Sequence, residues 1–575
     1  MSWIDIVQVV VLVGLLALLT KPLGVYMAHV FQGERTFADP VIKPVEHLIY
    51  RLTRVDETGE MAWTSYALAM LAFSLMGFLI LYAQLRLQGY LPLNPRGIAG
   101  MSPDLAFNTA VSFLTNTNWQ NYAGEAAVTN LSQMAGLTIQ NFLSAAVGLA
   151  VAVAFVRALV RKETKELGNF WVDVTRSWLY ILLPISIIGG VFFASQGVVQ
   201  TLSASTTVHT IEGASQLIPL GPVASQEAIK ELGTNGGGFF NANSAHPFEN
   251  PNPLTNFVEL FLVLLVPAAG TYMFGRMVGD QRQGWVLFIA MLLLFLASVG
   301  VSYSSERAGN PNLAKAGAFT TATTTQDGGN QEGKEIRFGT MGSVLFNTST
   351  TVTSAGAVNS MIDSFTPLAG GMAMLNIMLG EVIFGGVGAG LFTILIFVIL
   401  AVFIAGLMVG RTPEYLGKKI GAKEMKLSML AILAMNATTL GMAAISIALP
   451  SGLAGVLNSG PHGLSEILYY FVSAIGSNGS AFGGLTGNTL FYNSIGAVTM
   501  LIGRYFLLVP VLAIAGSLVV KKQVPESAGT FPTTGPLFVG LLIGVIVIIA
   551  GLTYFPVLAV GSIVEHFLMH AGQLF

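Results

Sequence analysis

The sequence predicts an all-α polytopic membrane protein with ten transmembrane helices, in which four pseudo-repeated helix–pore helix–filter loop–helix units surround one pore. Composition is the first reason: of 575 residues, 53% are hydrophobic and only 10% are charged, and the mean hydropathy is +0.69. A soluble protein of this size carries about 25% charged residues. The second reason is a short polar loop that recurs four times, at intervals of about 120 residues. The chain has no cysteine, which excludes disulfides and Cys-ligated metal sites.

Ten apolar runs are long enough to cross a bilayer, which takes about 20 apolar residues in a helix. The first run has no basic segment before it and no small-residue cleavage site, so we expect a retained helix rather than a signal peptide. The runs lie at residues 3–25, 63–86, 128–158, 171–196, 254–278, 284–303, 372–409, 425–449, 490–519 and 536–558.

The middle eight runs pair into four units, because a short amphipathic stretch and a polar loop stand between the two runs of each pair. We expect the short stretches to be pore helices, at residues 102–114, 224–232, 340–352 and 463–475. The predicted divisions of the chain are 1–62 (first helix and a cytoplasmic loop), 63–165, 166–282, 283–424 and 425–522 (the four units) and 523–575 (last helix).

The four polar loops align without gaps, and we interpret them as an ion filter. Inside a bilayer, non-helical backbone is tolerated where it lines a cavity, and backbone carbonyls there can replace the water shell of a monovalent cation. The pore helices would point their partly negative C-terminal ends at this cation. The alternative is that Gly and Thr only let helices pack closely. The aligned quartets are Thr115-Asn116-Thr117-Asn118, Gly233-Thr234-Asn235-Gly236, Thr353-Ser354-Ala355-Gly356 and Gly476-Ser477-Asn478-Gly479.

The expected cation is monovalent, because divalent sites usually include carboxylates and the quartets contain none. The predicted K⁺-binding residues are Thr115, Asn116, Thr117, Asn118, Thr234, Asn235, Gly236, Thr353, Ser354, Ala355, Gly356, Ser477, Asn478 and Gly479.

The long apolar run of the third unit is interrupted at Leu379–Gly390 by one acid and five glycines. Each glycine inside a helix costs about 1 kcal/mol relative to alanine, so we expect an unwound segment below the third filter loop that gates the pathway. A close helix–helix contact is the alternative. Glu381 and Arg504 are ionisable groups at membrane depth and therefore functional candidates; a purely structural salt bridge between them is equally open. The predicted pathway residues are Glu381, Gly385, Gly386, Gly388 and Arg504.

Basic residues concentrate in the loop after the first run and in the junctions between units. The positive-inside rule makes these segments cytoplasmic, which places both termini and the filter mouth outside. On this topology Lys230 and Glu231, beside the second loop, are expected to be solvated mouth residues, and the polar segment 304–340 a solvated loop. His246 is expected to be a hydrogen-bonded structural group.

Longer motifs resemble a known family. Thr115–Tyr122, Gly233–Phe240, His246–Pro251 and Gly410–Lys419 are similar to the A subunits of potassium-transporting ATPases, the KdpA family, within a superfamily of bacterial potassium transporters related to tetrameric potassium channels. The resemblance covers essentially the whole chain. One departure is Ala355, where the family often has cysteine, and this leaves a carbonyl-based filter intact.

The resemblance implies a potassium-binding and translocating subunit of a high-affinity, ATP-driven uptake complex in the bacterial plasma (inner) membrane. It implies K⁺ rather than Na⁺ as the ion, passage through an internal tunnel toward a KdpB-like P-type ATPase subunit, and KdpC-like and KdpF-like partners. Glu381 and Arg504 would then line or gate the route. Membrane lipid is expected around the chain, and neither a cofactor nor a nucleic-acid partner is expected.

Two other functions stay open at this point. A free-standing potassium channel or ion-coupled transporter of the same superfamily would share the four units. An integral-membrane enzyme is disfavoured, because no nucleophile–base pair or metal-ligand cluster is evident in the sequence, and the Asp-Lys-Thr-Gly phosphorylation signature is missing. We therefore expect no catalytic residue in this chain.

Overall fold

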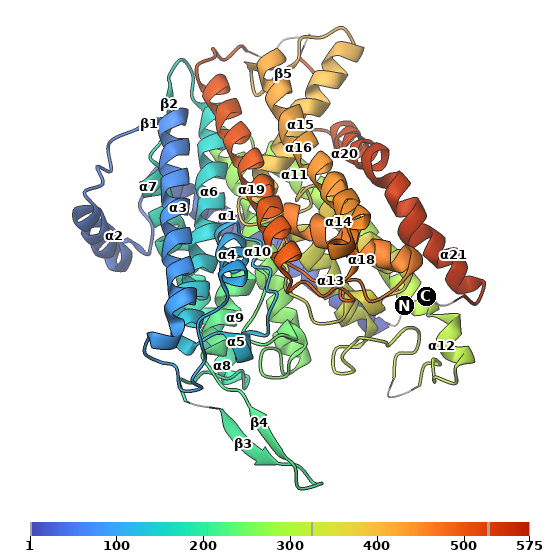
Figure 1. The fold of residues 1–575 in the computed structure, drawn as a ribbon. Helices are drawn as coiled ribbons and strands as arrows, with labels where there is room; N and C mark the ends of the chain where they lie inside the picture. The colour runs from blue at the N-terminus through green and yellow to red at the C-terminus, as the bar shows by residue number, and fades with distance from the viewer. Residues whose placement is uncertain (1–2, 204, 324–325, 526–529, 574–575) are drawn as a thin grey trace.

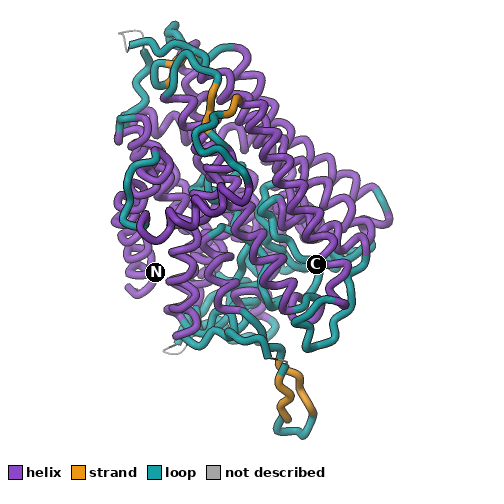
Figure 2. The backbone as a smooth tube through the Cα atoms, turned by 90° about the vertical axis from the view of Figure 1, so that its left-hand side faces the viewer, coloured by secondary structure: helices purple, strands orange, loops and turns teal. Residues whose placement is uncertain are grey.

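The computed structural model describes residues 3–203, 205–323, 326–525 and 530–573. Within them, ten helices are long and apolar enough to span a membrane, which confirms the predicted fold class. Figure 1 shows them side by side in one helical bundle, and Figure 2 shows that strands are confined to short pieces at the ends. The spanning helices are α1 (Trp3–Gln32), α3 (Trp63–Leu87), α6 (Ile139–Val160), α7 and α8 (Phe170–Arg176 and Leu183–Ser195), α10 (Pro253–Val278), α11 (Gln281–Ala308), α15 (Ala389–Met408), α16 (Ala422–Ala448), α19 (Leu490–Val519) and α20 (Pro536–Leu558).

Three of these helices contain a π-helical turn, a feature that inserts one extra residue into a helical turn. The π-turns precede α6 (Ser132–Thr138), join α7 to α8 (Ser177–Leu182) and join α20 to α21 (Ala559–Ile563). The remaining helices are α2 (Asp39–Thr53), α5 (Gly124–Ala127), α12 (Pro311–Lys315), α14 (Pro367–Met378), α17 (Pro450–Leu453) and α21 (Val564–His570). The strands are β1 (Met61–Ala62), β2 (Glu166–Gly168), β3 (Thr206–His209), β4 (Ser215–Ile218), β5 (Glu414–Tyr415) and β6 (Lys418–Lys419), which form three antiparallel pairs.

Four short helices stand at the positions predicted for pore helices. They are α4 (Pro103–Leu114), α9 (Val223–Leu232), α13 (Gly339–Thr353) and α18 (Gly460–Ile475). Each packs on a helix that precedes or follows it in its own unit and on a helix of the next unit around: α4 on α19, α9 on α6, α13 on α10 and α18 on α14. The fourth unit thus contacts the first, and the four units close into a ring.

The burial of the spanning helices places the core at the ring axis. α15 is buried over nearly its whole length, and α6 likewise, whereas most residues of α1 and α16 are not buried. The outer helices therefore present apolar side chains to lipid, as expected of a multi-pass membrane protein.

The basic junctions gather at one end of the bundle. The Lys418 ammonium donates hydrogen bonds to the carbonyl oxygens of Arg161, Leu518 and Lys521, and β1 pairs with β2. In Figure 1 this end carries β1, β2 and β5, while the β3–β4 hairpin projects from the opposite end.

The segment 304–340 differs from the predicted solvated loop. α11 continues to Ala308, and Lys334 forms an ion pair of 2.6 Å with Glu306, both side chains being fully buried. A buried ammonium needs a paired carboxylate. The sequence could not identify Glu306 as the partner of Lys334, because Glu306 lies on the preceding spanning helix.

Candidate ion-binding site

The four filter loops begin directly where the pore helices end, at Leu114, Leu232, Thr353 and Ile475. All four helices therefore direct their C-terminal carbonyls, which carry partial negative charge, toward the loops. Pro103 is the first residue of α4, and Pro461 is the second residue of α18, positions where proline suits the start of a helix. Ser102 occupies the N-cap position of α4, although its side chain makes no capping hydrogen bond there.

The loops share one backbone conformation. The second residue of every quartet has a left-handed φ, a region that residues other than glycine seldom adopt: 66° at Asn116, 50° at Thr234, 56° at Ser354 and 49° at Ser477. The fourth residue is left-handed again in three loops, at Asn118, Gly356 and Gly479. In the second loop this turn comes one residue later, at Gly237 with φ 71°.

The loops also meet at one place. A Cβ atom added to Gly236 would lie 2.9 Å from the carbonyl oxygen of Thr117, 3.1 Å from that of Asn478 and 3.2 Å from the Cα of Gly356. These atoms belong to the other three loops. Glycine at 236 is thus required by the close approach of the backbones.

Asparagine side chains connect the loops to one another. The Asn116 amide donates to the carbonyl of Thr234 at 2.9 Å, and the Asn235 amide donates to Oδ1 of Asn116 and of Asn118, each at 2.9 Å. The Asn478 amide, in the fourth loop, donates to the carbonyl of Thr350 on the third pore helix at 2.8 Å. Asparagine side chains therefore fix the loops in place, and one of them engages the Thr234 carbonyl.

Buried hydroxyls at the end of the third pore helix lack hydrogen-bond partners within the described residues. They belong to Thr348, Ser349, Thr350 and Ser354. Burying an unpaired hydroxyl is costly, so a cluster of four beside the loops indicates a place where water or a cation completes the shell.

The segment between α14 and α15 is not helical, and five of its residues have left-handed φ values: Gly380, Glu381, Phe384, Gly385 and Gly388. The Val387 amide donates to Oγ1 of Thr234 at 2.9 Å, so the segment contacts the second filter loop. A Cβ on Gly388 would overlap the carbonyl of Gly148 on α6.

Glu381 and Arg504 are both buried, with 3% and 5% of their surface exposed. No ion pair joins them among the described residues, so the salt bridge that the sequence left open as one alternative is not formed there. Instead, the Arg504 guanidinium donates to the carbonyl of Ser144 at 2.8 Å, and the Ser144 hydroxyl donates to Oδ1 of Asn116 at 2.8 Å. Arg504 thus connects to the first filter loop.

The prediction of solvated mouth residues is also wrong for Lys230 and Glu231, because both side chains are completely buried. His246 is a structural group, as predicted: its Nδ1 accepts a hydrogen bond from the Phe248 amide and its ring stacks on Phe240 at 3.7 Å. Burial and the nearby Arg337 lower the pKa of His246 to about 4, so it is neutral.

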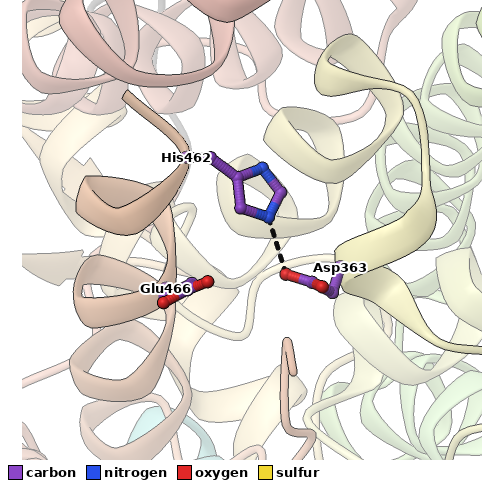
Figure 3. Close-up of side chains that lie close together, drawn as sticks. All are labelled: Asp363, His462 and Glu466. Carbon is purple, nitrogen blue, oxygen red and sulfur yellow. Dashed lines mark hydrogen bonds and ion pairs between the residues drawn. The ribbon is translucent and has the colours of Figure 1, made fainter. Parts of the chain in front are cut away.

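A charged cluster at α18 could not be found from sequence, because Asp363 and Glu565 lie 99 and 103 residues away from His462 along the chain. His462 Nε2 lies 2.7 Å from Asp363 Oδ1 (Figure 3), and Nδ1 lies 2.7 Å from Glu565 Oε1. Asp363, His462 and Glu466 form a group whose ligand atoms lie within 4.8 Å of one another. Both ring nitrogens are already engaged by carboxylates, which makes His462 a charged clamp between η5 (Ile362–Ser364), α18 and α21.

Comparison with known proteins decides the family. Residues 10–567 match the family described as KdpA, potassium-transporting ATPase A subunit. The chain belongs to this family. A protein of Methylorubrum populi named potassium-transporting ATPase potassium-binding subunit is 58% identical over 575 residues, covering 100% of this chain and 99% of its own. A protein of Brucella anthropi with the same name is 56% identical over 569 residues, 99% of each chain.

A solved structure shares the fold of this KdpA-family chain. The crystal structure of the potassium transporter TrkH from Vibrio parahaemolyticus matches 88% of this chain and 98% of its own, with a TM-score of 0.50 at 14% sequence identity.

Proposed function

We propose that this chain is the potassium-binding and translocating subunit of an ATP-driven, P-type potassium uptake complex. The observation that carries the proposal is the meeting of the four loops, in which Gly236 stands against backbone atoms of Thr117, Gly356 and Asn478. Carbonyls arranged around one axis can replace the hydration shell of a monovalent cation. The names of the relatives, which describe a potassium-binding subunit, support K⁺ as that cation.

The ion would enter from the outer side, be selected at the loops and pass inward beside the segment 379–388. Glu381 lies beside this route, because a Cβ on Gly386 would lie 3.7 Å from Glu381 Oε2 and 3.5 Å from Thr234 Oγ1. Arg504 is connected to the first loop through Ser144. In this proposal the carboxylate attracts the ion below the second loop, and the guanidinium, directed at Ser144, opposes its free passage.

The proposal includes a KdpB-like subunit that hydrolyses ATP, with KdpC-like and KdpF-like subunits, in the bacterial inner membrane. The gathering of basic junctions at one end of the bundle supports a cytoplasmic location of that end by the positive-inside rule. Both termini and the filter mouth would then be outside.

The test is the K⁺- and Rb⁺-dependent ATPase activity of the co-expressed complex, comparing the native chain with Gly236→Ala. The added Cβ meets three of the loops, so the K⁺ concentration for half-maximal activity should rise by about tenfold or more and the preference for K⁺ over Rb⁺ should fall. Gly270→Ala on α10 is the matched control, because its Cβ has no neighbour within 4 Å. Unchanged affinity and preference in Gly236→Ala would refute the filter.

A second measurement separates the pump from a free-standing channel. Membranes that contain this chain alone should take up K⁺ far more slowly than membranes with the full complex and ATP. Equal uptake would favour the channel.

A further inference from the structure

Lys230 is the feature that the proposed function leaves unexplained. It lies in the last turn of α9, four residues before Thr234, and its side chain is completely buried. Its ammonium Nζ lies 2.7 Å from Glu227 Oε2, 3.3 Å from Glu231 Oε1 and 3.3 Å from Glu249 Oε2. A fully buried ammonium in contact with three carboxylates is a fixed part of the structure, because its desolvation is repaid only in this arrangement.

Two neutral groups complete the surroundings of the ammonium. Nζ lies 3.1 Å from Asn243 Oδ1 and 3.3 Å from Ser244 Oγ. Five acceptors thus compete for three N–H bonds, so the ammonium is the centre of a network rather than half of a salt bridge.

The network continues into the filter backbone. The Asn243 amide donates to the carbonyl of Gly237, the residue that follows Gly236, and the Phe240 amide donates to Glu249 Oε1 at 2.7 Å. The Val358 amide, two residues after Gly356 in the third loop, donates to Asn243 Oδ1 at 3.3 Å. Through Asn243, the Lys230 ammonium is therefore connected to the backbone that follows the second and the third filter loop.

We propose that Lys230 is a positioning residue for ion selection, which fixes the second and third filter loops through Asn243 and Glu249. This inference rests on the proposed function. By holding the Asn243 amide against Gly237, Lys230 keeps that carbonyl directed away from the ion and sets the spacing of the carbonyls before it. Selectivity between K⁺ and Rb⁺ depends on the number and placement of such carbonyls, and a loop that relaxes loses its preference.

The charge of the network explains why a lysine stands here. Four carboxyl groups face this space: Glu227, Glu231, Glu249 and Glu259. Both carboxylate oxygens of Glu259 lack a hydrogen-bond partner among the described residues. Lysine is a compact charge with three donors pointing in different directions, whereas arginine has a larger planar fork. The compact ammonium of Lys230 therefore suits a position that has carboxylates on several sides.

The experiment uses the assembled complex with Lys230→Met, which keeps an unbranched side chain of nearly the same length and removes the charge. We expect K⁺-dependent ATPase activity with a half-maximal K⁺ concentration raised about tenfold, a preference for K⁺ over Rb⁺ lowered severalfold, and a maximal rate within about twofold of the native value. Lys315→Met, an exposed lysine on α12, is the control. An assembled Lys230→Met complex with native affinity and preference would overturn the inference.

A second pair of variants keeps the test decisive if Lys230→Met does not assemble. Asn243→Ala removes the connection between Lys230 and Gly237, and Glu249→Gln keeps an acceptor for the Phe240 amide while removing one charge. We expect Asn243→Ala to lower the K⁺ preference and Glu249→Gln to lower it less. If Gly236→Ala changes the preference for K⁺ over Rb⁺ and neither of these variants does, the filter is supported and the role of Lys230 is refuted. If all of the variants, Gly236→Ala included, leave this preference unchanged, the proposed function is refuted as well.

Combining two variants separates positioning from general stability. Where Lys230→Met assembles, the double variant with Asn243→Ala should change the K⁺ preference no more than the larger single change, because both act through one connection. Additive changes would show that Lys230 does not act through Asn243 and would contradict the proposed route.

Discussion

The four filter loops and the segment between α14 and α15 are both non-helical backbone among spanning helices, yet they are held differently. The loops are joined to one another by asparagine amides and pack so closely that Gly236 touches three neighbours. In the described part of the chain, one hydrogen bond, from Val387 to Thr234, joins the segment to the loops.

This difference separates a fixed element from a movable one. Hydrogen bonds between different units hold the loops, and shifting one loop would break several of these bonds. Like the loops, the segment holds non-glycine residues, Glu381 and Phe384, in left-handed backbone, a conformation that costs about 1–3 kcal/mol each. Unlike the loops, it has, among the described residues, few hydrogen bonds to other units that would keep it in place. We therefore expect substitutions in the loops to alter ion preference and substitutions in the segment to alter the rate of passage.

The largest effect is expected from Gly356→Ala. Gly356 has φ 79°, and a Cβ there would overlap the carbonyl oxygen of Asn478 and lie 2.7 Å from the Cα of Gly236. Two loops must move apart, so K⁺-dependent ATPase activity at saturating ATP should fall by about tenfold or more, with loss of the K⁺ preference. Gly441→Ala on α16, where a Cβ meets nothing within 4 Å, is the control. Native ion preference in an assembled Gly356→Ala complex would show that the four loops are not closely packed against one another.

Gly388→Ala should disturb the segment between α14 and α15 instead of the filter loops. Its φ is 82°, and the added Cβ would overlap the Gly148 carbonyl on α6. Because the loops are untouched, we expect the maximal rate of ATP hydrolysis to fall severalfold, by about 1 kcal/mol of barrier, while the half-maximal K⁺ concentration stays within about twofold. An altered K⁺ preference with a native maximal rate would erase the distinction between the two regions.

Hydropathy and repetition were sufficient to predict the ten helices and the four loops. Each spanning helix contains an apolar stretch long enough to cross a membrane, and the quartets align because each loop needs the same left-handed turn at its second residue. The interruption near Glu381 was also visible, since glycine and an acid are rare inside an apolar run.

Side-chain partners could not be predicted in the same way. Lys230 and Glu231 have the composition of a solvated surface, and only the folded chain brings Glu249 and Asn243 against them. Sequence placed Glu381 and Arg504 at membrane depth, but the direction of the guanidinium, toward Ser144, depends on how α19 packs on α6. The cluster at His462 was missed because its carboxylates come from three different elements.

The contact between the two regions can be weakened by itself at Thr234. Its hydroxyl accepts from the Val387 amide and donates to the Gly233 carbonyl at 2.7 Å. Thr234→Ala removes both bonds, each worth about 1 kcal/mol, whereas Thr234→Ser keeps the hydroxyl. We expect Thr234→Ala to lower both the K⁺ preference and the maximal rate by about threefold, and Thr234→Ser to resemble the native chain. Equal behaviour of the two variants would show that the hydroxyl does not couple the regions.

The smallest effect is expected at His462, which anchors the connection from the third filter loop to α14. Burial alone would lower the pKa of His462, but hydrogen bonds with Asp363 and Glu565 outweigh burial and raise the pKa to about 10. Protonated His462 stabilises the folded chain through its two carboxylate partners. Because the ordinary pKa of histidine is about 6.5, this stabilisation is complete below about pH 6.5 and is lost as the pH rises toward 10. His462→Gln should therefore lower the thermal unfolding temperature of the complex by about 2 °C at pH 6 and by almost nothing above pH 10.

The control for His462→Gln is His570→Gln, which removes an exposed histidine on α21. This variant should show no pH-dependent difference from the native chain. A loss in His462→Gln that stays constant from pH 6 to pH 10 would mean that the ring packs without carrying charge. The hydrogen bond from the Asp363 amide to the Phe482 carbonyl, at 2.8 Å, would then hold the connection to α14. In that case α14 would be fixed in place, like the filter loops, at every pH.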